Sequence, residues 1–441
     1  MTAEIAILNK SAVALATDSA VTISSGSSNH KVFDSADKLF ELSCTQPIGI
    51  MIYNGMHFAG IPLQDLIKDF RSQNDSYQTV KACVESLLSF LNEKGLAAPS
   101  SEKRSFLHNL VFPAAQKIRR DIEEEVSRRV FAAVQNGKKI DYLGRDAAEA
   151  VLRQLNNEVA GLPPGNFLLS SNSKDLDEWE RAEITEIISD VLGHVDADQQ
   201  GMAVQLVERL LLSRDLSPSR TGVIVAGFGS DDIFPTLLSF EMEGVLAGRL
   251  KFNWTEECDI DRAGPRAFIK PFAQKEMVER FLYGLDTGTQ DEIEEFARRT
   301  VGTIAARVLD RIASTDDTAL EEVRAGAREA EEAFIKNLRD QAFTAIVDRS
   351  RRSVEDMIEF MPKPELAKMA EALVELTSMK RKVSAGLETV GGPVDVAIIS
   401  RSEGFVWVKR KHYFPIELNA RYLTRVRPNY EPRRAQNAGD A

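Results

Sequence analysis

The stretch "AEIAILNKSAVALATDSAVTI", residues 3–23, comes directly after Met1 and Thr2 and predicts the beginning of a β-sheet. Its two strand-like runs, residues 4–8 and 12–17, are separated by the polar sequence Asn-Lys-Ser, which is typical of a hairpin turn. The hairpin carries a hydroxyl side chain before its first strand and an aspartate, Asp18, after its second strand. Polar groups therefore stand at one end of an otherwise apolar pair of strands.

The composition predicts a globular protein with an acidic surface. The 441 residues are 43% hydrophobic, which is enough for a sizeable core and for two or three folding units. The 67 acidic and 55 basic residues give a formal net charge of -12, which repels phosphate backbones and anionic membrane surfaces. We therefore expect no nucleic-acid partner and no membrane partner.

The lack of a recognisable targeting signal and the pattern of cysteines predict a cytoplasmic protein. The N-terminus lacks the basic start and long apolar region of a signal peptide, and no apolar run approaches the roughly 20 residues that span a bilayer. The three cysteines, Cys44, Cys83 and Cys258, are odd in number and have no Cys-x-x-Cys spacing. Neither a disulfide framework nor a structural zinc site is indicated, so the sequence predicts a cytoplasmic protein.

Further along the chain, β and helical patterns alternate. Helical spacing of apolar residues begins near Ile61, and the mixed-sign charge of residues 320–339 is typical of a solvated helix face. The predicted strands lie in three blocks, at about 3–60, 221–252 and 392–412. The first block contains a loop at 24–29, the second a turn at Glu243-Gly244, and the third a closing hairpin of 394–399 and 405–408. The predicted helical blocks are 61–212, with loops at 95–103 and 161–175, and 274–389; the tail 425–441 is expected to be disordered.

The run from Thr2 to Thr22 resembles the start of a mature proteasome-type β subunit, and equally its bacterial two-component relative. These proteins are N-terminal nucleophile hydrolases, in which processing makes the catalytic threonine the first residue. "DKLFEL" (37–42) is similar to the strand of the family's catalytic lysine, and "IGIMIYNG" (48–55) to the strand that ends at its oxyanion glycine. The resemblance covers roughly residues 2–70, 221–275 and 385–412.

The resemblance implies an α+β fold in which two sheets lie between helical layers, an α/β/β/α four-layer sandwich. Residues 1–424 would form a single core of this kind, enlarged by helical insertions at 71–220 and 276–385. The activity implied is that of an N-terminal-threonine peptidase, which needs no metal and no cofactor. A peptide or protein would be the substrate and a homo-oligomer the assembly, while an ATPase partner is left open.

The resemblance also implies a role for each candidate site residue. Thr2 would be the nucleophile once Met1 is removed, with its own α-amine as base, because a threonine hydroxyl needs a base within hydrogen-bond reach. Lys38 would place a positive charge beside that hydroxyl, and Asp18 would hold Lys38. Backbone N–H groups at Asn54-Gly55 would stabilise the oxyanion, with Gly55 as the oxyanion residue.

Three departures from the family pattern count against activity. In "LETVGG" (387–392), Leu387 stands at the position of a supporting aspartate and Val390 at that of a supporting serine, and Ala20 replaces a residue that is often basic. A catalytically inactive, proteasome-like scaffold or partner-binding protein is therefore the alternative. An unrelated α+β binding protein is the third reading, which requires the order of the strands to be coincidence.

The remaining polar motifs have ordinary structural interpretations. "GFGSDD" (227–232) lacks the Gly-Lys-Ser/Thr ending of a phosphate loop and is predicted to be a strand-terminating turn. The five histidines are scattered without a pair at metal-ligand spacing, and only His57 lies near the proposed site in sequence. The basic-aromatic segment 408–414 is short and is predicted to be a solvated strand end.

Overall fold

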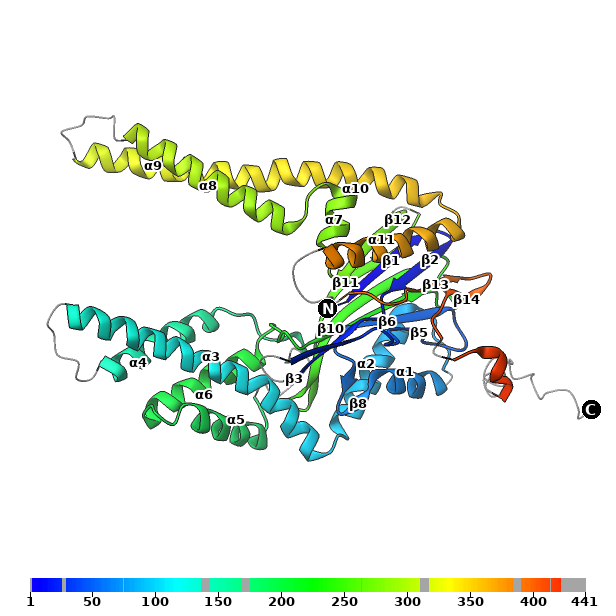
Figure 1. The fold of residues 1–441 in the computed structure, drawn as a ribbon, viewed down its shortest axis with the longest axis horizontal. Coiled ribbons are helices and arrows are strands. Elements are labelled where there is room, and N and C mark those ends of the chain that lie inside the picture. The colour runs from blue at the N-terminus through cyan, green and yellow to red at the C-terminus, as the bar shows by residue number, and fades with distance from the viewer. Residues whose placement is uncertain are drawn as a thin grey trace, which may run out of the picture. The chain divides into compact units, whose positions relative to one another are not determined.

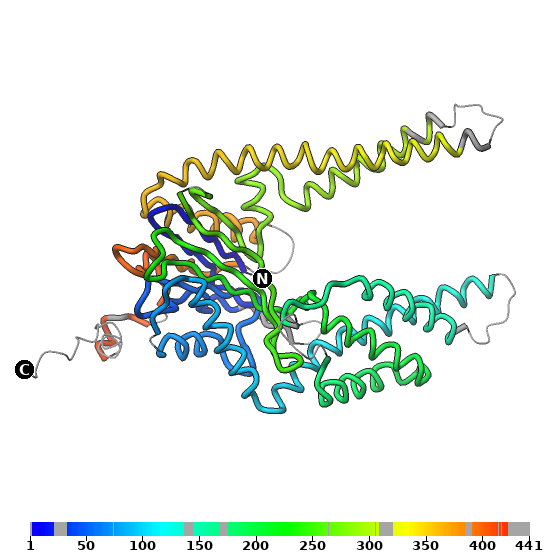
Figure 2. The backbone as a smooth tube through the Cα atoms, turned by 180° about the vertical axis from the view of Figure 1, so that it is seen from behind, coloured from blue at the N-terminus to red at the C-terminus, as the bar shows by residue number. Residues whose placement is uncertain are grey.

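The structure is a computed structural model, and its chain path can be followed in Figures 1 and 2. It describes residues 2–25, 29–73, 75–135, 143–168, 175–262, 264–309, 317–383, 390–412 and 414–421. The chain separates into two units, each with its own five-stranded sheet. Unit 1 comprises Met1–Leu39, Ile233–Pro235 and Cys258–Ala441, and unit 2 comprises Phe40–Asp232 and Thr236–Glu257.

The sheet of unit 1 has the strand order β12-β1-β2-β13-β14, and the four ladders that join these strands are antiparallel. Both predicted hairpins are present, one formed by β1 and β2 and the other by β13 and β14. The strands are β1 (Ala3–Asn9), β2 (Ala12–Thr17), β12 (Ala267–Ala273), β13 (Asp395–Ser400) and β14 (Gly404–Lys409).

Helices cover one face of this sheet. Ala12, Ala14 and Ala16 alternate along β2 with residues of the opposite face, and they belong to a core cluster with residues of helices α7, α10 and α11. Their small side chains let α11 lie closely across β1 and β2 (Figure 1). The bounds are α7 (Glu276–Tyr283), α10 (Thr344–Glu359) and α11 (Lys363–Val383). Because strand side chains alternate, Thr2, Glu4 and Thr17 fall on the face away from this cluster.

A helical arm extends the same unit. In Figure 2 the yellow tube continues from α9 into α10 without a break, and a short π-helical segment joins the two helices. The arm consists of α8 (Thr287–Leu309), α9 (Asp317–Asn337) and η2 (Leu338–Phe343). The predicted helix over residues 320–339 is therefore confirmed, and its described side chains are mostly exposed, as the mixed charge indicates.

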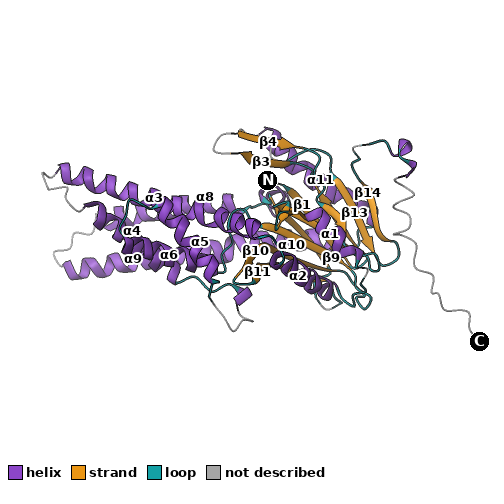
Figure 3. Cartoon of the chain, turned by 90° about the horizontal axis from the view of Figure 1, so that it is seen from below, coloured by secondary structure: helices purple, strands orange, loops and turns teal. Residues whose placement is uncertain are grey.

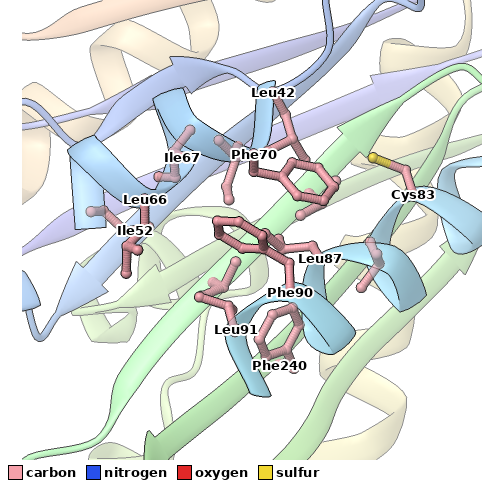
Figure 4. Packing of buried hydrophobic residues seen from close by; sticks show 14 of the residues in the cluster. Leu42, Ile52, Leu66, Ile67, Phe70, Cys83, Leu87, Phe90, Leu91 and Phe240 are labelled. Carbon is pink, nitrogen blue, oxygen red and sulfur yellow. The ribbon is translucent and has the colours of Figure 1, made fainter. Parts of the chain in front are cut away.

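The sheet of unit 2 has the order β11-β10-β9-β6-β5, with antiparallel ladders between β10 and β9 and between β9 and β6. β6 is buried along its length up to Asn54, as its apolar sequence predicts. Phe70 of α1 packs edge-on against Phe90 of α2 at the centre of the core over this sheet (Figure 4). The bounds are β5 (Leu39–Glu41), β6 (Ile48–Asn54), β9 (Thr221–Gly227), β10 (Thr236–Leu246), β11 (Arg249–Asp259), α1 (Leu63–Ser72) and α2 (Val80–Leu96).

A group of four helices, each labelled in Figure 3, forms a second core in unit 2. They are α3 (Ser100–Gln135), α4 (Leu143–Ala160), α5 (Glu178–Val191) and α6 (Ala197–Leu212), with the short η1 (Asn166–Leu168) between α4 and α5. The loop predicted at 95–103 is shorter than expected, because α2 extends to Leu96 and α3 begins at Ser100. None of the described helices combines the length and apolar character needed to cross a bilayer.

The predicted turn at Glu243-Gly244 is wrong. β10 runs through both residues, and the chain reverses at Ala247 and Gly248, whose φ angles are 50° and 70°. A two-residue hairpin turn with both φ values positive matches the twist of the flanking strands, which explains the choice. Gly244 serves packing instead, because a Cβ atom there would lie 2.5 Å from the ring of Phe106.

Two other strand predictions need correction. The predicted block 221–252 ends too early, because β11 continues to Asp259 and β12 follows it. Pro271 lies inside β12, and it is tolerated because β12 is an edge strand whose outer side needs no ladder donor. The loop predicted at 24–29 is also too long: β3 (Val21–Ser25) and β4 (Asn29–Phe33) reach into it.

Several elements complete the chain. The short ribbon of β7 (His57–Phe58) and β8 (Ile61–Pro62) precedes α1, and η3 (Ile416–Leu418) follows the last strand. The predicted disordered tail 425–441 and the end of the predicted helical block at 384–389 lie outside the described residues. The α+β class is confirmed, and the four-layer stacking of the two sheets stays a prediction.

Thr79 caps the N-terminus of α2 and provides a test of local stability. Its side-chain oxygen accepts a hydrogen bond from the backbone N–H of Ala82 at 3.1 Å. We expect Thr79→Ala to lower the free energy of unfolding by about 1 kcal/mol, because one of the orphan donors of the helix loses its acceptor. Urea unfolding monitored by circular dichroism measures this loss. Thr79→Ser retains the acceptor and should unfold close to wild type; equal losses for both variants would contradict a capping role.

Candidate functional site

Asp18 and Lys38 form a buried ion pair in unit 1. Asp18 follows the last residue of β2 and Lys38 precedes β5, so each stands where a strand ends or begins. Both side chains have no exposed surface, and the distance from Lys38 Nζ to Asp18 Oδ1 is 2.6 Å. Lys38 Nζ also donates to the backbone oxygen of Ala20 at 2.7 Å. The ammonium group is therefore held at a fixed position in the interior.

The Asp18 carboxylate is fixed by the backbone as well as by Lys38. Its Oδ1 accepts from the N–H of Ala3 at 3.2 Å, and its Oδ2 accepts from the N–H of Gly391 at 3.0 Å and of Ala20 at 3.4 Å. Burying a carboxylate costs free energy of desolvation, and hydrogen bonds of this kind to its oxygen atoms offset that cost. Asp18 thus joins the start of β1, the segment after β2 and the segment before β13.

Thr2 lies beside a second buried carboxyl group, that of Glu4. Thr2 is only 4% exposed, and its Oγ1 donates to Glu4 Oε2 at 3.2 Å. Thr17 stands opposite Glu4 in the ladder between β1 and β2, and its Oγ1 donates to Glu4 Oε1 at 3.4 Å. Glu4 itself has no exposed surface. The threonine hydroxyl is therefore oriented toward a carboxyl group that the rest of the strand pair encloses.

The electrostatics of Glu4 follow from its burial. Loss of hydration raises the pKa of Glu4 to about 8. The positive charge of Lys38 opposes the increase, whereas the negative charge of Asp18 adds to it, and hydrogen bonds from Thr2 and Thr17 lower the pKa slightly. The Lys38 ammonium group does not cancel the effect of burial on the pKa of Glu4, because its direct ion pair is with Asp18.

Sequence reasoning did not identify Glu4. A glutamate within an apolar strand is normally assigned to a solvated face, and nothing nearby in the sequence indicates burial. One signal was available: Glu4 lies two residues after Thr2, so the period of a strand places both side chains on the same face. Thr17 follows from the hairpin in the same way, because it stands opposite Glu4 in the register.

Gly55, the predicted oxyanion residue, lies in unit 2. It follows Asn54, which ends β6 with a φ angle of 63°. A Cβ atom at Gly55 would lie 1.9 Å from Thr221 Oγ1, so packing within unit 2 requires glycine. Thr2, Asp18 and Lys38 all belong to unit 1, and the oxyanion role of Gly55 stays a prediction.

The segment before β13 contacts the end of β2. Ser19 donates its backbone N–H to the oxygen of Gly391 at 3.1 Å and its hydroxyl to that of Pro393 at 2.6 Å. Val390, at the position of the family's serine, is fully buried and offers no hydroxyl group. Leu387, at the position of the aspartate, lies outside the described residues.

His57, the histidine nearest to the proposed site in sequence, belongs to unit 2. It is exposed in β7, whereas Thr2, Glu4, Asp18 and Lys38 belong to unit 1. Among the residues that the structure describes, no three side chains of His, Cys, Asp or Glu are grouped so that they could hold a metal ion.

These observations define a mixed α and β chain with antiparallel sheets and a buried cluster of threonine, glutamate, aspartate and lysine side chains. No protein-family model matches the chain, and no curated protein matches it. Among solved structures it is similar to the Anbu (Gly-1) mutant from Hyphomicrobium sp. strain MC1, with 10% sequence identity, full coverage of both chains and a TM-score of 0.25. A likeness at this TM-score assigns no activity to the chain.

Proposed function

We propose that this chain is an N-terminal-threonine amidohydrolase that cleaves peptide amide bonds. The observation that carries the proposal is the position of the Thr2 hydroxyl, which is bonded to Glu4 in a buried cluster with the Asp18–Lys38 ion pair. A threonine hydroxyl is a poor nucleophile at neutral pH and becomes reactive only beside a base and a stabilising positive charge. The cluster offers both kinds of group.

The reaction would pass through a covalent ester. Removal of Met1 would make Thr2 the first residue and free an α-amine, whose ordinary pKa of roughly 8 suits a base at neutral pH. Thr2 Oγ1 would attack the carbonyl carbon, and the amide C–N bond would break with a proton passing to the leaving amine. Water would then hydrolyse the ester. Lys38 would lower the cost of negative charge at Oγ1, and N–H groups at Gly55 would stabilise the oxyanion.

The assembly and the substrate belong to the same proposal. A peptide or protein is the substrate class that an amidohydrolase with a threonine nucleophile would take, and a homo-oligomer is the assembly that the family resemblance favours. The reaction described above uses only groups of the chain and water.

The test combines intact-protein mass with covalent labelling on protein expressed without an N-terminal tag. We expect the mass to be lower by one methionine residue, and a β-lactone reagent to add its full mass at Thr2 through an ester bond. The matched control is Thr2→Ala, which should acquire no adduct at position 2. An N-terminus that retains Met1, or an adduct whose yield is unchanged in Thr2→Ala, would rule out the proposed nucleophile.

The second candidate is a catalytically inactive scaffold or partner-binding protein. Val390 favours it, because a fully buried apolar side chain stands where the resemblance expects a supporting hydroxyl group. The low exposure of Thr2, 4%, favours it as well, since a nucleophile must reach its substrate. The labelling experiment separates the two candidates: a scaffold acquires no adduct at position 2, either in wild type or in Thr2→Ala.

A further inference from the structure

Glu4 occupies the position that a base for Thr2 requires. The hydroxyl oxygen of Thr2 donates its hydrogen bond to Glu4 Oε2 at 3.2 Å, which is the direction of proton transfer from a nucleophile to its base. The other oxygen, Oε1, is held by Thr17 Oγ1 at 3.4 Å. The Thr17 hydroxyl lies 3.0 Å from the backbone oxygen of Asp18, a second potential acceptor, so Thr17 also contacts the ion-pair segment.

The surroundings leave this carboxyl group without a cation in direct contact among the described residues. Lys38 directs its Nζ to Asp18 and to the backbone oxygen of Ala20. Among the described residues, the charged groups that act on Glu4 are Lys38 and Asp18; across the ladders it faces Thr17 on β2 and Phe272 on β12. Burial places the pKa of Glu4 at about 8, so both protonation states are populated near physiological pH, as a proton-transferring group requires.

The α-amine is poorly supported by comparison. Its supporting aspartate and serine in the resembled family are replaced by Leu387 and Val390, and the described one of these, Val390, is a buried apolar side chain. We propose that Glu4 is a further catalytic residue, which takes the proton of the Thr2 hydroxyl in place of the α-amine. This inference rests on the proposed function, in which Thr2 is the nucleophile.

Proton and electron movements balance in this scheme. As the Thr2 Oγ1–C bond forms, the hydroxyl proton passes to the Glu4 carboxylate. As the substrate C–N bond breaks, Glu4 returns that proton to the leaving amine. In the second half, Glu4 accepts a proton from water as the hydroxide attacks the ester, and it returns this proton to Thr2 Oγ1 when the ester bond breaks.

The test is the rate at which a β-lactone labels Thr2 between pH 5 and 9, measured by intact mass. In wild type the rate should rise through about pH 8 as Glu4 ionises. Glu4→Gln retains shape but accepts no proton, so its rate should fall by about 100-fold and lose the rise. Glu4→Asp should recover part of the rate and keep a rise with pH.

Control variants separate this inference from the proposed function. Glu180→Gln neutralises a buried carboxyl group in unit 2 that binds the N–H of Ala247, and it should label like wild type. If Glu4→Gln labels at the wild-type rate with the same pH profile while Thr2→Ala does not label, Glu4 is not the base although Thr2 remains the nucleophile. If wild type itself acquires no adduct at Thr2, both the proposed function and this inference fail.

Discussion

Replacing Lys38 by methionine is expected to lower the free energy of unfolding by about 3–5 kcal/mol. Methionine fits a similar volume but leaves the Asp18 carboxylate buried without its cation, which is 2.6 Å away in the structure. Guanidinium unfolding at pH 7 measures the difference. Because removing one partner of a buried pair costs more than removing both, Lys38→Met combined with Asp18→Asn should recover part of the loss.

A matched control for Lys38 is available in the same unit. Lys10 forms an ion pair with Glu359 at 2.9 Å, but its side chain remains 34% exposed. Water screens such a pair, so Lys10→Met should cost less than about 1 kcal/mol. A loss for Lys38→Met as small as that of Lys10→Met would show that the buried pair contributes little to the fold.

Stability should fall as pH rises from about 5 to above 8, and Glu4 should cause most of this change in unit 1. Its pKa is raised from 4.5 to about 8 in the folded protein. Below pH 4.5 both the folded and the unfolded chain bind the proton, and the full stability is present. Between these values the unfolded chain releases the proton while the folded chain keeps it, so unfolding becomes more favourable with each increase in pH. The total loss is about 5 kcal/mol from pH 4 to pH 9.

Denaturant midpoints at a series of pH values, converted to free energies, measure this dependence. Glu4→Gln carries no titrating proton, so its curve should be flatter than that of wild type and should cross it, with the variant more stable at pH 9. Glu93→Gln, which removes an exposed carboxyl group from α2, should retain the wild-type slope. A Glu4→Gln curve parallel to that of wild type would mean that Glu4 is hydrated or paired in solution.

The parts of the fold that the sequence predicts are those determined by near neighbours. The turn at residues 9–11 and the turn before Gly404 each join two apolar runs, and both hairpins form as expected. The helical blocks follow from apolar periodicity for the same reason. The predicted reversal at Glu243-Gly244 fails because glycine was taken as the signal of a turn, whereas positive φ at two successive residues decides the reversal.

The site is less predictable because distant segments determine it. The family resemblance indicates Thr2, Asp18 and Lys38, and the structure places all three in unit 1. Glu4 could not be assigned from its neighbours, because its burial depends on β2 and β12 lying on either side of β1. β12 was itself missed, since Pro271 argues against a strand unless the strand is known to be at an edge.

The position of β13 has a consequence for how the protein is made. β13 pairs with β2, and Gly391 donates to an aspartate 373 positions earlier in the chain. The ribosome synthesises β1 and β2 first. The strand β13, which pairs with β2, becomes available only after nearly the whole polypeptide has been synthesised. Contacts of such long sequence separation form late in folding. The environment of Thr2 is therefore completed only at the end of synthesis, and a nascent or truncated chain would carry Thr2, the proposed nucleophile, without these surroundings.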